Sequence, residues 1–232
     1  MPLKLFPIKY LVPGLAATLL PVGVAQAVTL TFTDSVDSAR TNFTSDVSIP
    51  QFDSSLGELT NIFIELAGSV SGSIQLESTD ADSSNVTANL VSEIKLQRPD
   101  MSDLVVVLPT ASEDANFTAF DGTVDFGGTS GLTSNNLSET ATESILLTDP
   151  SDFGIFLGTG NLVLPVAALG RSNASGSGNL ATVFQTFAGA DITVSYEYTE
   201  RPTAVPEPNA PMGALALVGL GMMAKRKLAK KA

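Results

Sequence analysis

Apolar and polar side chains alternate with a period of two along most of the chain between residues 28 and 200. Successive side chains of a β-strand point to opposite faces, so this alternation predicts strands with one buried and one solvated face. No stretch of a dozen residues in this region has the apolar period of an amphipathic helix. The alternating runs are 29–33, 61–66, 69–77, 93–97, 123–126 and 192–199.

Two further runs, 104–108 and 162–166, are apolar almost throughout. Dense apolar runs of this length predict strands that are covered on both faces. Residues that favour tight turns separate the strands, in the segments 53–57, 121–122, 127–128 and 172–178. Many short strands joined by turns predict an all-β fold, an antiparallel two-sheet β-sandwich of the jelly-roll or immunoglobulin-like type.

The N-terminal segment has the pattern of a secretory signal peptide. Lys4 and Lys9 supply the positive charge, and residues 11–24 form an apolar stretch. Ala25 and Ala27 flank Gln26 in the small-x-small pattern of a signal peptidase site, which predicts cleavage after Ala27. The alternative is an uncleaved membrane helix, which the prolines and glycine within this stretch disfavour.

Three features follow one another at the C-terminus. The extended segment 201–209 contains Pro206, Glu207 and Pro208, and 14 apolar residues follow from 211 to 224. A basic cluster that begins with Lys225, Arg226 and Lys227 closes the chain. The pattern predicts a short transmembrane helix whose positive end stays in the cytoplasm. The predicted parts are 1–27 (signal peptide), 28–200 (β-sandwich), 201–209 (linker) and 210–232 (helix and basic tail).

This C-terminal arrangement resembles the PEP-CTERM sorting signal of Gram-negative bacteria. The resemblance implies that an exosortase, a membrane-embedded enzyme, recognises the segment and cuts near Pro206–Glu207–Pro208. The prolines and the basic cluster would then be substrate elements and not catalytic residues. It also implies an exported protein of a bacterium that makes exopolysaccharide, held transiently in the inner membrane and then found in the envelope, at the outer surface or in the extracellular matrix.

The middle of the chain resembles a second family, the choice-of-anchor E domain. The resemblance lies in segment 49–60, in the turn at 119–124 and in the alternating strand 192–198. It implies an exported β domain and names no activity.

Composition removes several chemistries from consideration. The 232 residues include no His, Cys or Trp, so Ser-His-Asp and Cys-His catalysis, imidazole metal sites and disulfides are excluded. Between Lys9 and Lys225, five basic residues stand against all 24 acidic residues, a formal charge of −19. A field of that sign repels phosphate backbones, so nucleic acid is excluded as a partner.

Acidic loops leave calcium as the one cofactor to consider. Asp80 and Asp82 lie in an acidic segment with Ser84 and Asn85 nearby, and Asp121 and Asp125 lie in a second turn. An EF-hand is excluded, because its sixth and twelfth positions, counted from Asp80, hold Asn85 and Val91. An irregular Ca²⁺ site in either loop stays open.

Two catalytic patterns fail on their context. Ser92 and Lys95 match a Ser-x-x-Lys pattern, but three residues apart on a strand they point to opposite faces. The glycine-rich segment 176–181 fits a dinucleotide fingerprint, yet a loop precedes it and a strand-like run follows it.

The sequence therefore predicts a non-enzymatic structural or interaction role, with signal peptidase, exosortase, the membrane and possible exopolysaccharide as partners. A polysaccharide- or Ca²⁺-binding module is the alternative, and a secreted hydrolase is the distant one. Sugar sites usually contain exposed aromatic rings. The only tyrosines of the middle segment, Tyr196 and Tyr198, are assigned to the edge of the core, which counts against a lectin or a glycosidase.

Overall fold

The computed structural model describes residues 27–176 and 178–201. These residues belong to one compact unit, Gln26–Arg201, which is built from strands and two short 3-10 helices, η1 (Pro150–Asp152) and η2 (Gly154–Phe156). In this part of the chain no helix is long and apolar enough to span a bilayer. The strands are β1 (Ala27–Arg40), β2 (Phe43–Pro50), β3 (Gly57–Ser78), β4 (Ser84–Gln97), β5 (Asp103–Val107), β6 (Thr110–Phe117), β7 (Gly131–Leu147), β8 (Asn161–Gly170), β9 (Asn173–Ser175) and β10 (Leu180–Glu200).

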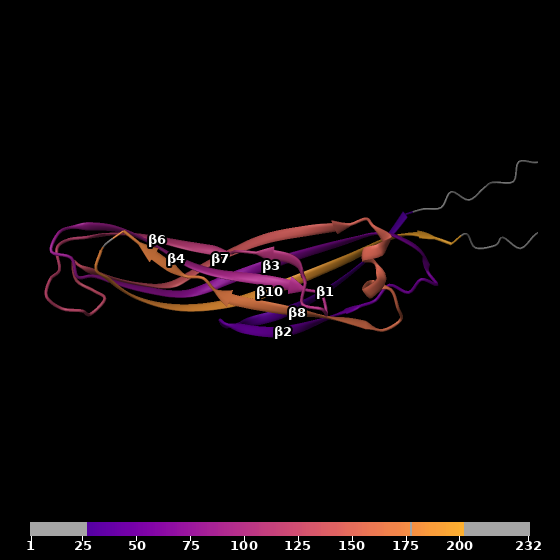
Figure 1. Cartoon of the computed structure of the whole chain (residues 1–232), viewed down its shortest axis with the longest axis horizontal. Coiled ribbons are helices and arrows are strands. Elements are labelled where there is room, and N and C mark those ends of the chain that lie inside the picture. The colour runs from indigo at the N-terminus through magenta and orange to yellow at the C-terminus, as the bar shows by residue number, and fades with distance from the viewer. Residues whose placement is uncertain (1–26, 177, 202–232) are drawn as a thin grey trace, which may run out of the picture. The chain divides into compact units, whose positions relative to one another are not determined.

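The strands form two antiparallel sheets, as the alternation predicts (Figure 1). The first sheet has the order β1-β10-β3-β7 and the second has the order β2-β8-β4-β5. Strand β4 pairs with β6 and β9 along its first half and with β5 and β8 along its second half. The segments β5 and β6 therefore act as one interrupted strand, and so do β8 and β9.

If β5 and β6 count as one strand, and β8 and β9 as another, the domain has eight strands. The first strand pairs with the last, the second with the second to last, and so on inward. Strand β1 pairs with β10, β2 with β8, β3 with β7, and β4 with β5 and β6. A long antiparallel hairpin that is rolled up into two sheets produces this nested order, which is the topology of a jelly roll. The order differs from that of the immunoglobulin sandwich, in which one sheet is built from strands A, B, E and D.

Strand β3 shows why the strands are so long. The predicted runs 61–66 and 69–77 have the same parity, so they continue through Ala67 and Gly68 as one strand of 22 residues. At about 3.3 Å per residue this strand extends roughly 70 Å. Strand β10, with 21 residues, runs beside it in Figure 1.

The two ends of the described domain lie together. Ala27, the first residue of β1, is in register with Thr199 near the end of β10. Gly57, at the start of β3, is in register with Glu200 on the other side of β10. The opposite end of the domain carries the loops 79–83 and 118–130, which are joined by a hydrogen bond from Phe120 N to the carbonyl oxygen of Asp80 (2.9 Å).

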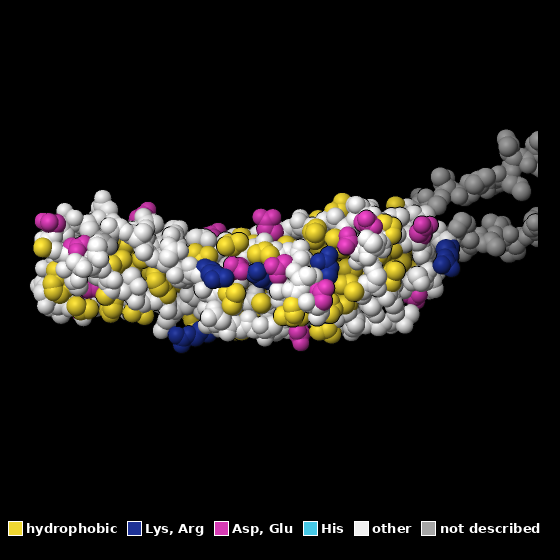
Figure 2. Space-filling view, in the orientation of Figure 1, with side chains coloured by type: hydrophobic (Ala, Val, Ile, Leu, Met, Phe, Trp, Pro, Cys, Tyr) yellow, Lys and Arg dark blue, Asp and Glu magenta, His cyan; other side chains and the backbone are white. Residues whose placement is uncertain are grey.

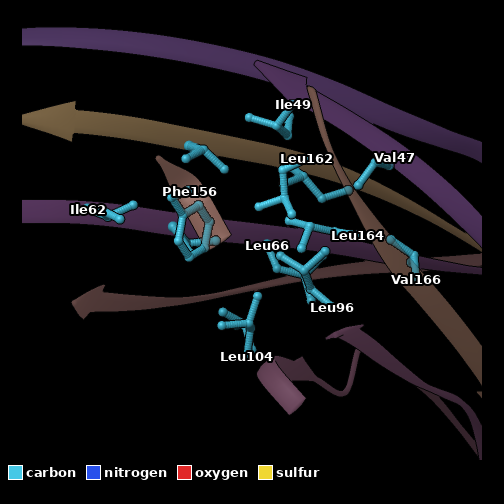
Figure 3. Packing of buried hydrophobic residues seen from close by; sticks show 14 of the residues in the cluster. Val47, Ile49, Ile62, Leu66, Leu96, Leu104, Phe156, Leu162, Leu164 and Val166 are labelled. Atoms are coloured by element: carbon cyan, nitrogen blue, oxygen red, sulfur yellow. The ribbon is translucent and has the colours of Figure 1, made fainter. Parts of the chain in front are cut away.

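Side chains from both sheets fill the core in two clusters. The larger cluster has 24 buried residues at the end of the domain that holds Ala27 and Thr199, and Figure 3 shows part of it, with Leu66, Leu96, Phe156, Leu162 and Leu164 pointing toward one another. The smaller cluster has nine buried residues toward the other end, including Ile74, Leu90 and Phe117. Packing between the sheets therefore stabilises the fold without any disulfide.

One predicted strand is wrong. Residues 123–126 lie in the 118–130 loop and pair with no strand. Phe126 has a φ of 58°, which is left-handed, and its N–H donates to the carboxylate of Glu77 (2.7 Å). A side-chain acceptor on β3 thus takes the place of a neighbouring strand.

The expectation of burial on both faces for the two dense apolar runs is also partly wrong. Leu104, Val105 and Val107 are buried, but Leu108 is 54% exposed and Val163 is 49% exposed. Leu108 lies in the break between β5 and β6. Val163 lies on the outer face of β8, which no third layer covers in a two-layer sandwich.

Candidate functional site

The predicted sorting and cleavage residues lie mostly outside the described residues. This applies to Ala25 and to the segments 206–208 and 225–227. Ala27 is described; it is exposed and begins β1.

The first calcium candidates are engaged in loop contacts. The carboxylate of Asp80 accepts hydrogen bonds from Gly178 N (3.1 Å) and from Asn179 Nδ2 (2.8 Å). These contacts attach the loop after β3 to the segment before β10. Asp82, two residues further on, is exposed to solvent.

The second pair of calcium candidates caps turns. Asp121 accepts from Thr123 N (3.0 Å), and Asp125 accepts from Gly127 N (2.9 Å), so each carboxylate closes a turn two residues on. Within residues 27–176 and 178–201, no three Asp, Glu, His or Cys side chains are grouped to hold a metal ion. The structure therefore does not bring the four candidates together.

Glu77 is a buried carboxylate that the sequence did not single out. It is 0% exposed, and it accepts from Phe126 N and from the hydroxyl of Ser130, both at 2.7 Å. Its neighbour in sequence, Leu76, points into the core from the opposite face of β3. Glu77 thus holds the 118–130 loop over the outer face of the first sheet, which is a structural role.

The two rejected catalytic patterns have the geometry that their context predicts. Ser92 is fully buried on the core side of β4, whereas the ammonium of Lys95 lies on the outer face between two carboxylates. Gly176 follows β9, and the chain continues after a short turn into β10, where a dinucleotide site requires a helix.

Paired charges gather on the outer face of the second sheet. Lys95 Nζ lies 2.9 Å from Asp103 and 3.2 Å from Glu93, and Glu93 also pairs with Arg171 at 3.3 Å. Figure 2 shows dark blue and magenta side chains alternating across the middle of one face. Hydrogen bonds from Lys95 and Gln97 hold the pKa of Asp103 below its ordinary value, and the hydrogen bonds that Lys95 donates to Asp103 and Glu93 raise its own pKa.

The outer face of the first sheet is uncharged toward the end of the domain that is farther from Ala27 and Thr199. Segments 66–76 of β3, 131–138 of β7 and 180–190 of β10 contain no ionisable residue. The strand register places these three segments side by side. A neutral polar surface thus interrupts a strongly acidic domain.

A β-bulge hollows this neutral surface. Gly72 is in register with Leu137 and Ile74 with Ser134, so two residues of β7, Asn135 and Asn136, stand opposite the single Ser73. Asn136 adopts a left-handed φ of 59°, which asparagine tolerates better than most residues. A depression of about 470 Å³ lies here, and it is lined by Ser71, Gly72, Ser73, Asn135, Asn136, Leu137, Ser138, Gln185 and Phe187.

The polar side chains of this depression have no hydrogen-bond partner within the described part of the protein. Within the described residues, the amides of Asn135, Asn136 and Gln185 and the hydroxyls of three serines make no hydrogen bond to protein. Elsewhere the amides of Asn42, Gln51 and several others are engaged by protein groups. Phe187 adds an aromatic ring that is 36% exposed.

Sequence reasoning missed all of these residues. The absence of Trp and the assignment of both tyrosines to the core left Phe187 unconsidered, and Tyr196 is in fact 0% exposed. The available signal was the absence of charge in three separate segments of an acidic chain. Only the strand register shows that the three segments are neighbours.

Comparison with known proteins gives no family for this chain. No family model matches it, and no curated protein matches it. Among solved structures it is similar to a chain of Desmodium yellow mottle tymovirus, with 8% sequence identity, a TM-score of 0.20, and coverage of 88% of this chain and 100% of that chain.

Similarity also extends to infectious bursal disease virus. A structure of the Gx strain matches at 13% identity and a TM-score of 0.17, over 97% of this chain and 55% of that chain. The VP2 subviral particle matches at 12% identity and a TM-score of 0.18, over 96% and 54%. The chain thus spans about half the length of these viral chains. TM-scores this low support no conclusion, and the jelly-roll order rests on the strand pairs alone.

Proposed function

We propose that this chain is an exported bacterial surface or extracellular-matrix protein with a non-enzymatic structural or interaction role. A signal peptide over residues 1–27 directs export and is removed by signal peptidase. The predicted helix and basic tail, residues 210–232, then hold the chain in the inner membrane until an exosortase processes it near Pro206–Glu207–Pro208. The released or attached product is the jelly-roll domain, a component of the envelope or of an exopolysaccharide matrix.

The observation that carries this proposal is the position of the two ends of the domain. Ala27 and Thr199 are register partners, so the chain enters and leaves the sandwich at the same end. With β3 roughly 70 Å long, a domain that is attached through residues 201–209 extends its far end well away from the point of attachment. That geometry suits a protein that displays a surface beyond a membrane or within a polymer.

The cleavage site fits the start of the fold. Ala27 is exposed and is the first of the 14 residues of β1. Cleavage after it shortens β1 by one residue and leaves Val28 onward to pair with β10. Removal of the signal peptide therefore leaves the remaining strand pairs of the sandwich unchanged.

The processing site is supported by its own chemistry. Proline has no backbone N–H and disfavours the helical conformation of the residue before it. We therefore expect Pro206 and Pro208 to disfavour a helix between the domain and the apolar segment, and an extended backbone is the form that a processing enzyme binds.

The test replaces Pro206, Glu207 and Pro208 together by alanine in the full chain and follows the protein in its native host. We expect export to be unchanged, while the variant keeps residues 225–232 and stays with the membrane fraction. The matched control is Pro202→Ala, which removes a proline of the same linker outside the triplet and is expected to be processed like the wild type. Processing of the triple variant at the wild-type rate would contradict the proposal.

A further inference from the structure

We propose that the depression on the outer face of the first sheet binds an uncharged glycan. Its walls are the bulge of β7 and the neighbouring segments of β3 and β10, and its lining contains amides, hydroxyls and one aromatic ring. This inference goes beyond export and sorting and does not depend on them, because it concerns the folded domain alone.

Hydrogen-bonding capacity is the first argument. Each of the amides of Asn135, Asn136 and Gln185 offers both donors and an acceptor, and each serine hydroxyl offers both functions. Sugar hydroxyls also donate and accept, so neighbouring hydroxyls of one ring match an amide group. No protein group among the described residues takes up this capacity.

The aromatic ring is the second argument. Phe187 lines the depression and is 36% exposed, so its ring is accessible from solvent. One face of a pyranose ring presents C–H groups, which pack against the electron-rich face of an aromatic ring. Phe187 therefore supplies the apolar contact, and the amides supply the polar ones.

Charge defines the class of glycan. No ionisable side chain lines the depression, and none occurs in the three strand segments around it. The strongly acidic domain repels an anionic polymer such as a polyuronate. A cationic ligand is disfavoured as well, because no carboxylate lines the depression. Arg40 of β1 is the register partner of Phe187, so one basic residue lies next to the aromatic edge of the depression, although it does not line it.

Backbone geometry defines the shape of the site. Asn136 is held in a left-handed conformation, and a Cβ at Gly72 would overlap the carbonyl oxygen of Gln185. Bulges and strained residues of this kind are concentrated where a protein aims side chains at a ligand. The volume of about 470 Å³ falls within the range of ~300–1,000 Å³ that is common for small-molecule sites.

The test measures binding by calorimetry with the full chain in a detergent that has no sugar headgroup. The probes are neutral hexasaccharides of glucose, galactose, mannose and N-acetylglucosamine, and alginate serves as the anionic comparison. We expect at least one neutral probe to bind and alginate not to bind. Binding of none of the neutral probes, or stronger binding of alginate, overturns the proposal.

Variants locate the site. Phe187→Ala is expected to weaken binding of the neutral probe about tenfold or more, and Asn136→Gly about two- to tenfold. Glycine is chosen at residue 136 because it keeps the left-handed backbone. Phe187→Tyr keeps the aromatic ring, so Phe187→Tyr should bind within about twofold of the wild type. Leu146→Ala removes another exposed apolar side chain of the same sheet, 55% exposed and far from the depression, and should leave affinity unchanged.

The outcomes separate folding from binding. Each variant is accepted only when its thermal midpoint and circular dichroism match those of the wild type. Wild-type affinity in Phe187→Ala and Asn136→Gly together would place any bound glycan elsewhere and contradict the proposal. Failure of the export test leaves this result unaffected, because the two experiments share no variant.

Discussion

Glu77 fixes a loop from inside the protein. Both of its carboxylate oxygens accept hydrogen bonds from the 118–130 loop, one from Phe126 N and one from Ser130 Oγ. Alternation along β3 correctly places Glu77 on the outer face of the sheet. Its burial could not be predicted from the sequence, because the loop that covers it lies about 50 residues further along the chain.

Glu77→Gln is expected to lower the free energy of unfolding by about 1–3 kcal/mol. The amide has only one oxygen, so it can no longer accept from both Phe126 N and Ser130 Oγ, and one of these two donors loses its acceptor. Thermal or urea denaturation measures the change. Glu58→Gln makes the same chemical change at an exposed position of β3 and should alter stability by no more than about 0.5 kcal/mol. Equal effects of the two substitutions would show that the buried contacts contribute nothing.

Tyr196 joins the two sheets at the centre of the larger cluster. Its hydroxyl donates to the carbonyl oxygen of Pro50 (2.9 Å), and its ring packs against Phe32 and Phe156, with centroids 6.0 and 6.5 Å away. Burial raises the pKa of Tyr196 from 10.0 to about 12. The alternation of residues 192–199 predicted the inward face of this residue correctly.

The raised pKa of Tyr196 makes stability fall at high pH. Below pH 10 both the folded and the unfolded chain keep the phenol proton, and between pH 10 and about 12 only the unfolded chain loses it. The free energy of unfolding should therefore drop by up to about 3 kcal/mol across this window. Urea denaturation should show that the wild type loses stability relative to Tyr196→Phe by this amount as the pH rises from 10 to 12. A difference that stays constant would mean that this phenol does not contribute.

At the scale of elements, Gly72 is a point of close approach between β3 and β10. A side chain there would overlap the carbonyl oxygen of Gln185, and the φ of 151° is unfavourable for other residues. The bulge of β7 lies beside the same residue, on the other side of β3. The bulge in turn aims Asn135 and Asn136 into the depression.

Gly72→Ala should lower the free energy of unfolding by about 1–3 kcal/mol, because the strands must move apart or strain the backbone. Gly154→Ala is the matched control, since a Cβ at Gly154 meets no atom within 4 Å. Denaturation of the two variants side by side measures the difference. Similar stabilities would show that β3 and β10 do not approach closely at residue 72.

Strands were more predictable than loops for a physical reason. Runs such as 61–66 and 192–199 bury every second residue, and that pattern is local. The 123–126 segment has the same alternation, yet it forms a loop, because Phe126 N donates its hydrogen bond to the side chain of Glu77 on β3 and not to a neighbouring strand. The outward exposure of Val163 likewise depends on the number of layers, which no local pattern contains.

For the whole molecule, the sequence predicted two antiparallel sheets but left two topologies open. Strand order depends on which distant segments pair, such as β1 with β10, and alternation is the same for every partner. The neutral depression escaped prediction for the same reason. Its residues come from three strands that are 40 or more positions apart in the chain.

The central claim concerns the whole chain: a strand-built acidic domain is exported and then trimmed at both ends. Intact-mass measurement of the protein, recovered from the surface or medium of its native host, tests this claim most directly. The account predicts a chain that begins at Val28 and ends at or near Pro206–Glu207–Pro208. A chain found in the cytosol that retains Met1 and the terminal Lys225–Ala232 segment would contradict it.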